Sequence, residues 1–139
     1  MRRLAALALL TFAAPAPAAE PEKVDLFHAD TAGYRIYRIP GVVVTKAGTV
    51  IAYCEARKTN SDWATIDILA RRSADGGKTW GEPAKVADVP GPKARNPVAV
   101  ARKDVSKTDV TYNNPVMIAD RSGAVVAPAP GCRPATRCT

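Results

Sequence analysis

The sequence predicts an all-β protein built from short antiparallel strands. β-Branched and aromatic residues are concentrated in short runs, and these runs are separated by turns rich in Gly, Pro, Asn and Asp. No apolar pattern with a helical period appears after residue 19. Short strands joined by tight turns form a meander, so we expect one sheet in which each strand pairs with the next.

The first 19 residues have the composition of a secretory signal peptide. Arg2 and Arg3 form a basic start, an apolar stretch runs from Leu4 to Ala14, and Ala16-Pro17-Ala18 offers small residues for cleavage. The apolar stretch is too short to span a membrane. We therefore expect segment 1–19 to be removed, and the mature protein to be secreted or periplasmic with no membrane attachment.

The first part of the mature chain shows two β-rich runs before the central strands. Alternation in Val24–Phe27 predicts a short strand, and Asp30–Gly33 predicts a turn. The next run, Tyr34–Ile39, is expected to end at Pro40-Gly41, because this pair interrupts regular pairing.

Four further runs predict a four-stranded meander. Val42–Thr45 and Thr49–Cys54 flank Lys46-Ala47-Gly48, which predicts a hairpin with glycine in the left-handed conformation. Thr65–Arg72 and Ala84–Val89 supply the third and fourth strands.

The remainder of the chain predicts a loop followed by a second hairpin. Pro90–Thr111 is polar and rich in Pro and Lys, Asn114–Ala119 begins a strand, and Asp120–Gly123 is a hairpin turn. The chain after Ala124 should be the partner strand, but it contains three prolines that cannot extend a ladder. We expect a folded domain at 20–123 and an aberrant or frameshifted tail at 124–139.

Composition argues against several classes of function. The net charge is +7, but no run of Lys and Arg is interleaved with aromatic residues, so nucleic-acid binding has no support. The single histidine, His28, and the three cysteines show no metal-ligand spacing, so no metal or cofactor is expected. Cys54 lies in an apolar run and is expected to be a small buried residue.

The segment Ser73–Trp80 reads Ser-x-Asp-x-Gly-x-Thr-Trp and predicts a self-contained turn. The Asp75 carboxylate can accept amide protons of its own turn, Gly77 allows a positive φ, and Trp80 can cover the neighbouring strands. This pattern resembles the Asp-box of the sialidase β-propellers. Its members here are Ser73, Asp75, Gly77, Thr79 and Trp80.

Three further matches occur in the same order as in bacterial exo-α-sialidases. They are Tyr37-Arg38-Ile39-Pro40, then Glu55-Ala56-Arg57 with Ser61-Asp62-Trp63, then Arg71-Arg72-Ser73. The resemblance covers about Val24 to Gly123. It implies the first blade and the start of the second blade of a six-bladed β-propeller. It also implies an enzyme that removes terminal sialic acids from glycoconjugates with retention and without a cofactor.

The resemblance also implies roles for four residues. Arg38 matches the first of three arginines that bind the sialic acid carboxylate, a task suited to a planar guanidinium. Asp62 matches the general acid/base of enzymes that use a tyrosine nucleophile. Arg57 and Asn114 match residues that line the sugar pocket.

Each of these residues also has a simpler interpretation. Arg38 can be a surface arginine before a structural proline, and Asp62 can be a turn aspartate. Arg57 shares a face with Glu55, so a structural salt bridge between them is a rival to sugar binding. Asn114 can begin a strand, and Asp67 is expected to be a structural hydrogen-bonding carboxylate.

Other parts of a sialidase site are implied to lie on later blades. The family's nucleophilic tyrosine, the glutamate that activates it and two further arginines are expected beyond this chain, so we expect the chain alone to be inactive. The alternative is part of a non-catalytic Asp-box propeller that binds glycans or proteins. Such a module has no need of an acid at Asp62.

Overall fold

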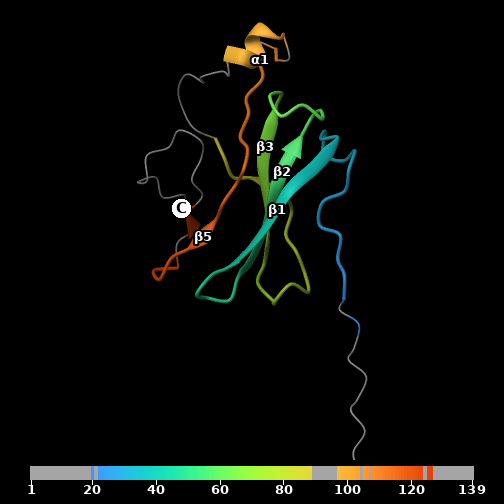
Figure 1. Ribbon diagram of the computed structural model, residues 1–139. Coiled ribbons are helices and arrows are strands. Elements are labelled where there is room, and N and C mark those ends of the chain that lie inside the picture. Colours follow the sequence, from blue (N-terminus) through green and yellow to red (C-terminus); the bar gives the residue numbers. More distant parts are fainter. Residues whose placement is uncertain are drawn as a thin grey trace, which may run out of the picture.

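The computed structural model describes residues 20, 22–88, 97–103, 105–106, 108–123 and 125–126. Their main feature is a four-stranded antiparallel sheet in which each strand pairs with the next along the chain (Figure 1). The expected signal peptide and most of the expected tail lie outside the described residues. The predicted all-β class and the consecutive antiparallel order are confirmed. The strands of this sheet are β1 (Ile36–Val44), β2 (Val50–Arg57), β3 (Ile66–Ser73) and β4 (Ala84–Lys85).

A second, smaller sheet pairs β5 (Ile118–Ala119) with β6 (Val125–Val126) in antiparallel orientation. The turn between them is closed by the Gly123 amide, which donates to the Asp120 carbonyl at 3.1 Å. The predicted hairpin turn is therefore present, and its partner strand reaches Val126.

The β1–β2 hairpin is closed by the loop Lys46–Gly48, as predicted. The Thr45 amide donates to the Thr49 carbonyl, and the Gly48 amide donates to the Thr45 carbonyl, both at 2.9 Å. Gly48 has a φ of 83°, a conformation that glycine adopts without steric cost. Local turn chemistry is thus sufficient to set the register of this hairpin.

Strand β1 continues through Pro40 and Gly41, so the predicted break at this point is wrong. Arg38 pairs with Glu55 and Gly41 pairs with Tyr53, which leaves two residues of β1 opposite one residue of β2. This arrangement is a β-bulge, in which Ile39 has a φ of 52°. A bulge accepts proline because the extra residue need not donate to the ladder.

Three other predicted segments differ from the structure. Val24–Phe27 is not a strand, and the Phe27 ring instead packs against Tyr37 with centroids 5.5 Å apart. Strand β4 is limited to Ala84–Lys85 among the described residues. The predicted loop 90–111 contains the short helix α1 (Pro97–Ala101). Tertiary packing and proline at the helix start decide these segments, and neither produces a periodic pattern.

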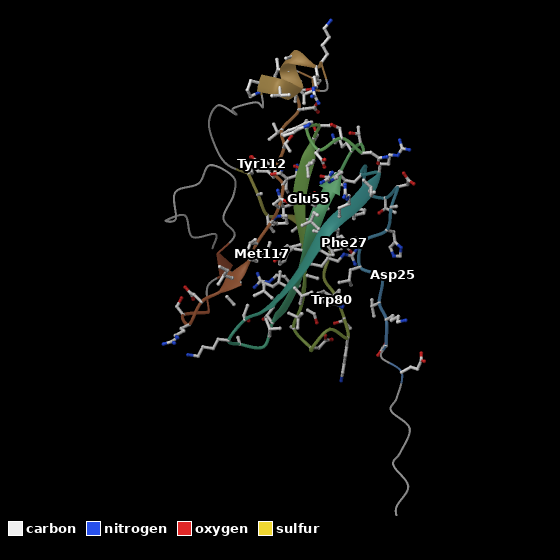
Figure 2. The ribbon with its side chains drawn as sticks, viewed as in Figure 1. Asp25, Phe27, Glu55, Trp80, Tyr112 and Met117 are labelled. Carbon is white, nitrogen blue, oxygen red and sulfur yellow. The ribbon has the colours of Figure 1, made fainter. Side chains whose placement is uncertain are left out.

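One face of the main sheet is covered by the chain that leads into β5. Tyr112 and Met117 pack against a buried cluster of sheet residues and lie on the same side of the sheet (Figure 2). The Met117 amide donates to the Tyr53 hydroxyl at 3.2 Å. The covered sheet residues are Ile51, Tyr53, Ile68 and Ala70.

The opposite face is covered in part by the N-terminal segment. The Phe27 ring lies 5.9 Å from the Arg71 guanidinium carbon, and the Tyr34 hydroxyl donates to Asp67 at 2.7 Å. Lys85 pairs with the other oxygen of Asp67 at 3.0 Å, so Asp67 is a structural carboxylate, as predicted. Cys54 is buried as predicted, and burial, with the nearby Glu55 charge, raises the pKa of its thiol to about 12.

The turn from Ser73 to Trp80 is held by its own side chains. The Asp75 carboxylate accepts the Thr79 amide at 2.9 Å and the Thr79 hydroxyl at 2.6 Å. The Trp80 indole donates to the Gly77 carbonyl at 2.8 Å. The Gly81 amide also donates to the Arg72 carbonyl at 2.9 Å, which joins the end of β3 to the chain that enters β4.

The described residues contain no helix with the length and hydropathy of a membrane span. Within the same ranges, no three His, Cys, Asp or Glu side chains are grouped as ligands for a metal ion.

Gly41→Ala should destabilise the protein by about 1–3 kcal/mol, the usual range for overpacking. The added Cβ would lie 2.7 Å from Cε2 of Tyr53, a buried ring that also bonds Met117. Gly81→Ala is the matched control, since its Cβ meets only the Arg72 carbonyl at 3.6 Å. Urea unfolding of both variants tests this, and equal stabilities would contradict it.

Acid should destabilise the protein partly through Asp75. Hydrogen bonds from the Thr79 hydroxyl and amide, and then from Ser73, hold the pKa of Asp75 well below its usual range. A lowered carboxyl pKa stabilises the fold above the unfolded value of about 3.9 and loses this effect as pH falls further. The temperature at which the protein unfolds should therefore decrease as the pH falls below about 4.

Between pH 4 and pH 2, the Asp75→Asn variant should lose less stability than the wild-type protein loses. Asp25→Asn, at an exposed position outside the turn, is the control. Thermal unfolding between pH 7 and pH 2 should separate the two variants, and superimposable profiles would argue against the role of Asp75.

Candidate functional site

Four charged side chains gather where β1 begins and β2 ends. Arg38 pairs with Glu55 across the two strands, and Arg57 lies two residues beyond Glu55 on the same face. The loop after β2 then brings Asp62 back to Arg57. Two arginines and two carboxylates therefore lie close together at one end of the sheet.

The innermost pair is Glu55 with Arg57. The Arg57 Nε and Nη2 atoms both donate to Oε2 of Glu55, at 2.8 and 2.5 Å. Glu55 is 0% exposed and the Arg57 side chain is 5% exposed. The structural salt bridge considered from the sequence is present, and it leaves the Nη1 atom of Arg57 for a third contact.

That third contact is Asp62. Nη1 of Arg57 donates to Oδ1 of Asp62 at 2.5 Å, and Nη1 of Arg38 lies 4.0 Å from the same oxygen. The Asp62 side chain is 63% exposed, so the pair is open to solvent on one side. Arg57 thus connects a fully buried carboxylate to an exposed one.

These contacts favour the charged forms of Arg57 and Asp62. The hydrogen bond and charge of Arg57, with a smaller effect from Arg38, lower the pKa of Asp62. Burial opposes the charge on Arg57, but bonds with Asp62 and Glu55 outweigh it and raise its pKa. In this arrangement Asp62 is an ionised partner of two arginines, whereas a general acid must hold a proton.

Arg38 is the more accessible of the two arginines. Its side chain is 50% exposed, and among the described residues its ion-pair partner is Asp62. A guanidinium in this position has donors available for a planar anion such as a carboxylate.

Asn114 reaches the same cluster through its backbone. Its amide donates to Oε1 of Glu55 at 2.6 Å, although the two residues are 59 positions apart in the chain. Asn114 has a φ of 52°, a conformation that asparagine adopts more readily than most residues. The structure therefore brings together all four residues named from the resemblance.

The sequence did not predict that Glu55 binds two partners at once, Arg57 and the backbone of Asn114. The only available signal was a glutamate between apolar residues of a strand, a position where a carboxylate needs partners if it is buried. The Ser73–Trp80 turn is separate from the cluster: Ser73 pairs with Val50, at the opposite end of β2 from Arg57. Its side-chain hydrogen bonds connect residues of the turn itself.

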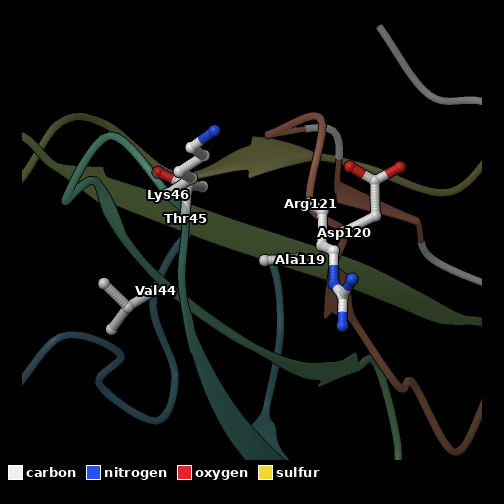
Figure 3. A pocket seen from close by; sticks show the side chains of 6 residues that line it. All are labelled: Val44, Thr45, Lys46, Ala119, Asp120 and Arg121. Atoms are coloured by element: carbon white, nitrogen blue, oxygen red, sulfur yellow. The ribbon is translucent and has the colours of Figure 1, made fainter.

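A hollow of about 480 Å³ lies at the far end of β1 from the cluster. Its lining includes Lys46 and Arg121, whose side chains extend in different directions (Figure 3). Because these cations do not converge, the hollow does not form a second charged site.

No family model matches the chain. It is 42% identical over 69 residues to the sialidase of Micromonospora viridifaciens, covering 48% of this chain and 11% of that protein. It is 30% identical over 105 residues to the anhydrosialidase of Macrobdella decora, covering 70% of this chain and 14% of that protein. A sialidase of Clostridium perfringens is 36% identical over 64 residues, covering 44% of this chain and 17% of that protein.

The chain thus spans less than a fifth of the length of these curated relatives. Its four-stranded meander and the following strand pair correspond to one blade and the start of the next in a β-propeller. On these similarities and this architecture, the chain belongs to the sialidase family.

Proposed function

We propose that this chain forms part of an exported exo-α-sialidase that hydrolyses terminal sialic acids of glycoconjugates with retention. The observation that carries the proposal is the convergence of Arg38, Arg57 and Asp62 at one end of the blade. The composition of residues 1–19 supports export.

Arg38 is the proposed contact for the substrate carboxylate. Sialic acid carries a carboxylate at neutral pH, and an arginine can bind it with two parallel N–H···O bonds. The half-exposed position of Arg38 supports this role, because the guanidinium can exchange its partner without unfolding its strand.

Asp62 is the proposed general acid. A substrate carboxylate bound at Arg38 would place a second negative charge near Asp62 and compete for the same guanidinium. Both effects raise the pKa of a carboxyl group. Protonation of Asp62 would also require that its bond to Arg57 be broken, because Arg57 is the larger cause of the lowered pKa of Asp62.

The nucleophilic tyrosine and the remaining arginines would come from other parts of the enzyme. Two tyrosines of the described residues already have structural partners, since Tyr34 donates to Asp67 on the opposite face of the sheet and Tyr53 accepts from Met117. The ionised state of Asp62 favours the second candidate, a non-catalytic propeller that binds acidic glycans through Arg38.

Asp62→Ala in the full-length protein should separate these two functions. For an acid, turnover of a fluorogenic sialoside should fall by roughly 100- to 10,000-fold, while binding of N-acetylneuraminic acid is retained. Asp25→Ala is the control, because this exposed carboxylate lies on the other side of the sheet (Figure 2). Unchanged turnover in the Asp62 variant would refute the acid role.

A full-length wild-type protein that binds N-acetylneuraminic acid but does not hydrolyse the sialoside would support the binding module instead. The absence of both binding and turnover would overturn both candidates.

Arg38→Lys should weaken binding of N-acetylneuraminic acid by roughly 10- to 100-fold, since lysine keeps the charge but loses the planar fork. Arg35→Lys, at an exposed position just before β1, should bind as wild type does. The methyl ester of the sugar should respond much less to Arg38→Lys. Calorimetric titration measures all three, and an equal loss for acid and ester would exclude carboxylate recognition by Arg38.

A further inference from the structure

Glu55 is buried in the sheet and binds two residues of the candidate site. One carboxylate oxygen accepts Nε and Nη2 of Arg57, and the other accepts the amide of Asn114. Glu55 itself is fully buried, so a ligand in the site would not reach it without displacing these contacts.

The guanidinium group makes this arrangement directional. Its five N–H donors lie in one plane with fixed geometry. Once Nε and Nη2 are bound to Glu55, rotation about the side-chain axis is blocked and Nη1 is directed at Asp62, 2.5 Å away. A lysine or a loosely held arginine could approach Asp62 from many directions.

The second oxygen of Glu55 acts on a distant part of the chain. Asn114 is held in a left-handed conformation that is uncommon for a non-glycine residue, and the hydrogen bond from its backbone amide to Glu55 fixes it there. The position at which the chain approaches β5 is therefore tied to the end of β2.

We infer that Glu55 is a positioning residue that aims Arg57 at Asp62 and holds Asn114 beside them. The inference rests on the proposed function for its effect on turnover, but the restraint on Arg57 is independent of any activity. A pair that served stability alone would not require Arg57 to offer its remaining donor to an exposed carboxylate.

Glu55→Gln tests the inference because it keeps one acceptor oxygen for Asn114 and replaces the oxygen that binds Arg57. Asp67→Asn is the matched control: it neutralises another buried carboxylate of the same sheet, whose partners are Tyr34 and Lys85. If the two variants lose similar amounts of stability, a difference between them in Arg57 restraint or in turnover is due to the loss of the Glu55 contacts at the site.

The first measurement is nuclear magnetic resonance of the Arg57 side chain in the 139-residue chain. Wild type and Asp67→Asn should show slow exchange of the Nε proton and separate Nη signals, whereas Glu55→Gln should show fast exchange and merged signals. A restrained Arg57 in Glu55→Gln would overturn the inference.

The second measurement is sialoside hydrolysis by the full-length protein. Glu55→Gln should lower kcat/KM by roughly 100-fold, the scale expected for a misplaced catalytic contact, and Asp67→Asn should stay near wild type. Equal activity of the two variants, with Arg57 released, would overturn the positioning role. An inactive wild type would refute the proposed function, and the resonance measurement would then decide the restraint by itself.

Glu55→Asp covers the case in which Glu55→Gln does not fold. It keeps the charge that the buried Arg57 requires, but the shorter side chain cannot reach both partners. We expect the Asn114 amide to exchange at least tenfold faster with solvent, or the Arg57 signals to merge. Wild-type behaviour of both groups would contradict the inference.

Discussion

A buried carboxylate that must be fully paired organises this molecule. Glu55 is enclosed at the end of β2, where an unpaired charge would be strongly unfavourable. Removing one partner of such a pair typically costs about 3–5 kcal/mol. The chain satisfies Glu55 from two directions, with Arg57 of the same strand and the backbone of Asn114. The charged end of the sheet and the approach to β5 therefore form one unit.

An apolar contact on the same face complements this polar one. Tyr53, two residues before Glu55, packs over Gly41 and accepts the Met117 amide. The segment from Asn114 to Met117 is thus fixed at both ends against a single strand. The main sheet can therefore hold the charged cluster at its end in a defined arrangement, although the strands β5 and β6 that follow are short.

Local chemistry made part of this structure predictable. The Lys46–Gly48 loop follows from a glycine that adopts positive φ, and it needs no distant partner. Val24–Phe27 looked like a strand because its pattern alternates, but packing of Phe27 on the sheet decides its conformation. The site residues were found through a family resemblance. The link from Glu55 to Asn114 could not be predicted, because no local pattern connects residues 59 positions apart.

The bulge in β1 allows Arg38 and Gly41 to lie on the same side of the sheet. Arg38 and Gly41 are three residues apart, and in a regular strand they would face opposite sides of the sheet. The extra residue at Ile39-Pro40 places both on the same side as Glu55 and Tyr53. If Ile39 and Pro40 both paired in a regular ladder, Arg38 would turn to the opposite face, away from Glu55. Loss of one of the two residues would instead remove the bulge and leave Arg38 opposite Glu55. The side on which Arg38 lies is therefore set by how two neighbouring residues pair, and a natural variant could lose the bulge by deletion without turning Arg38 away from Glu55.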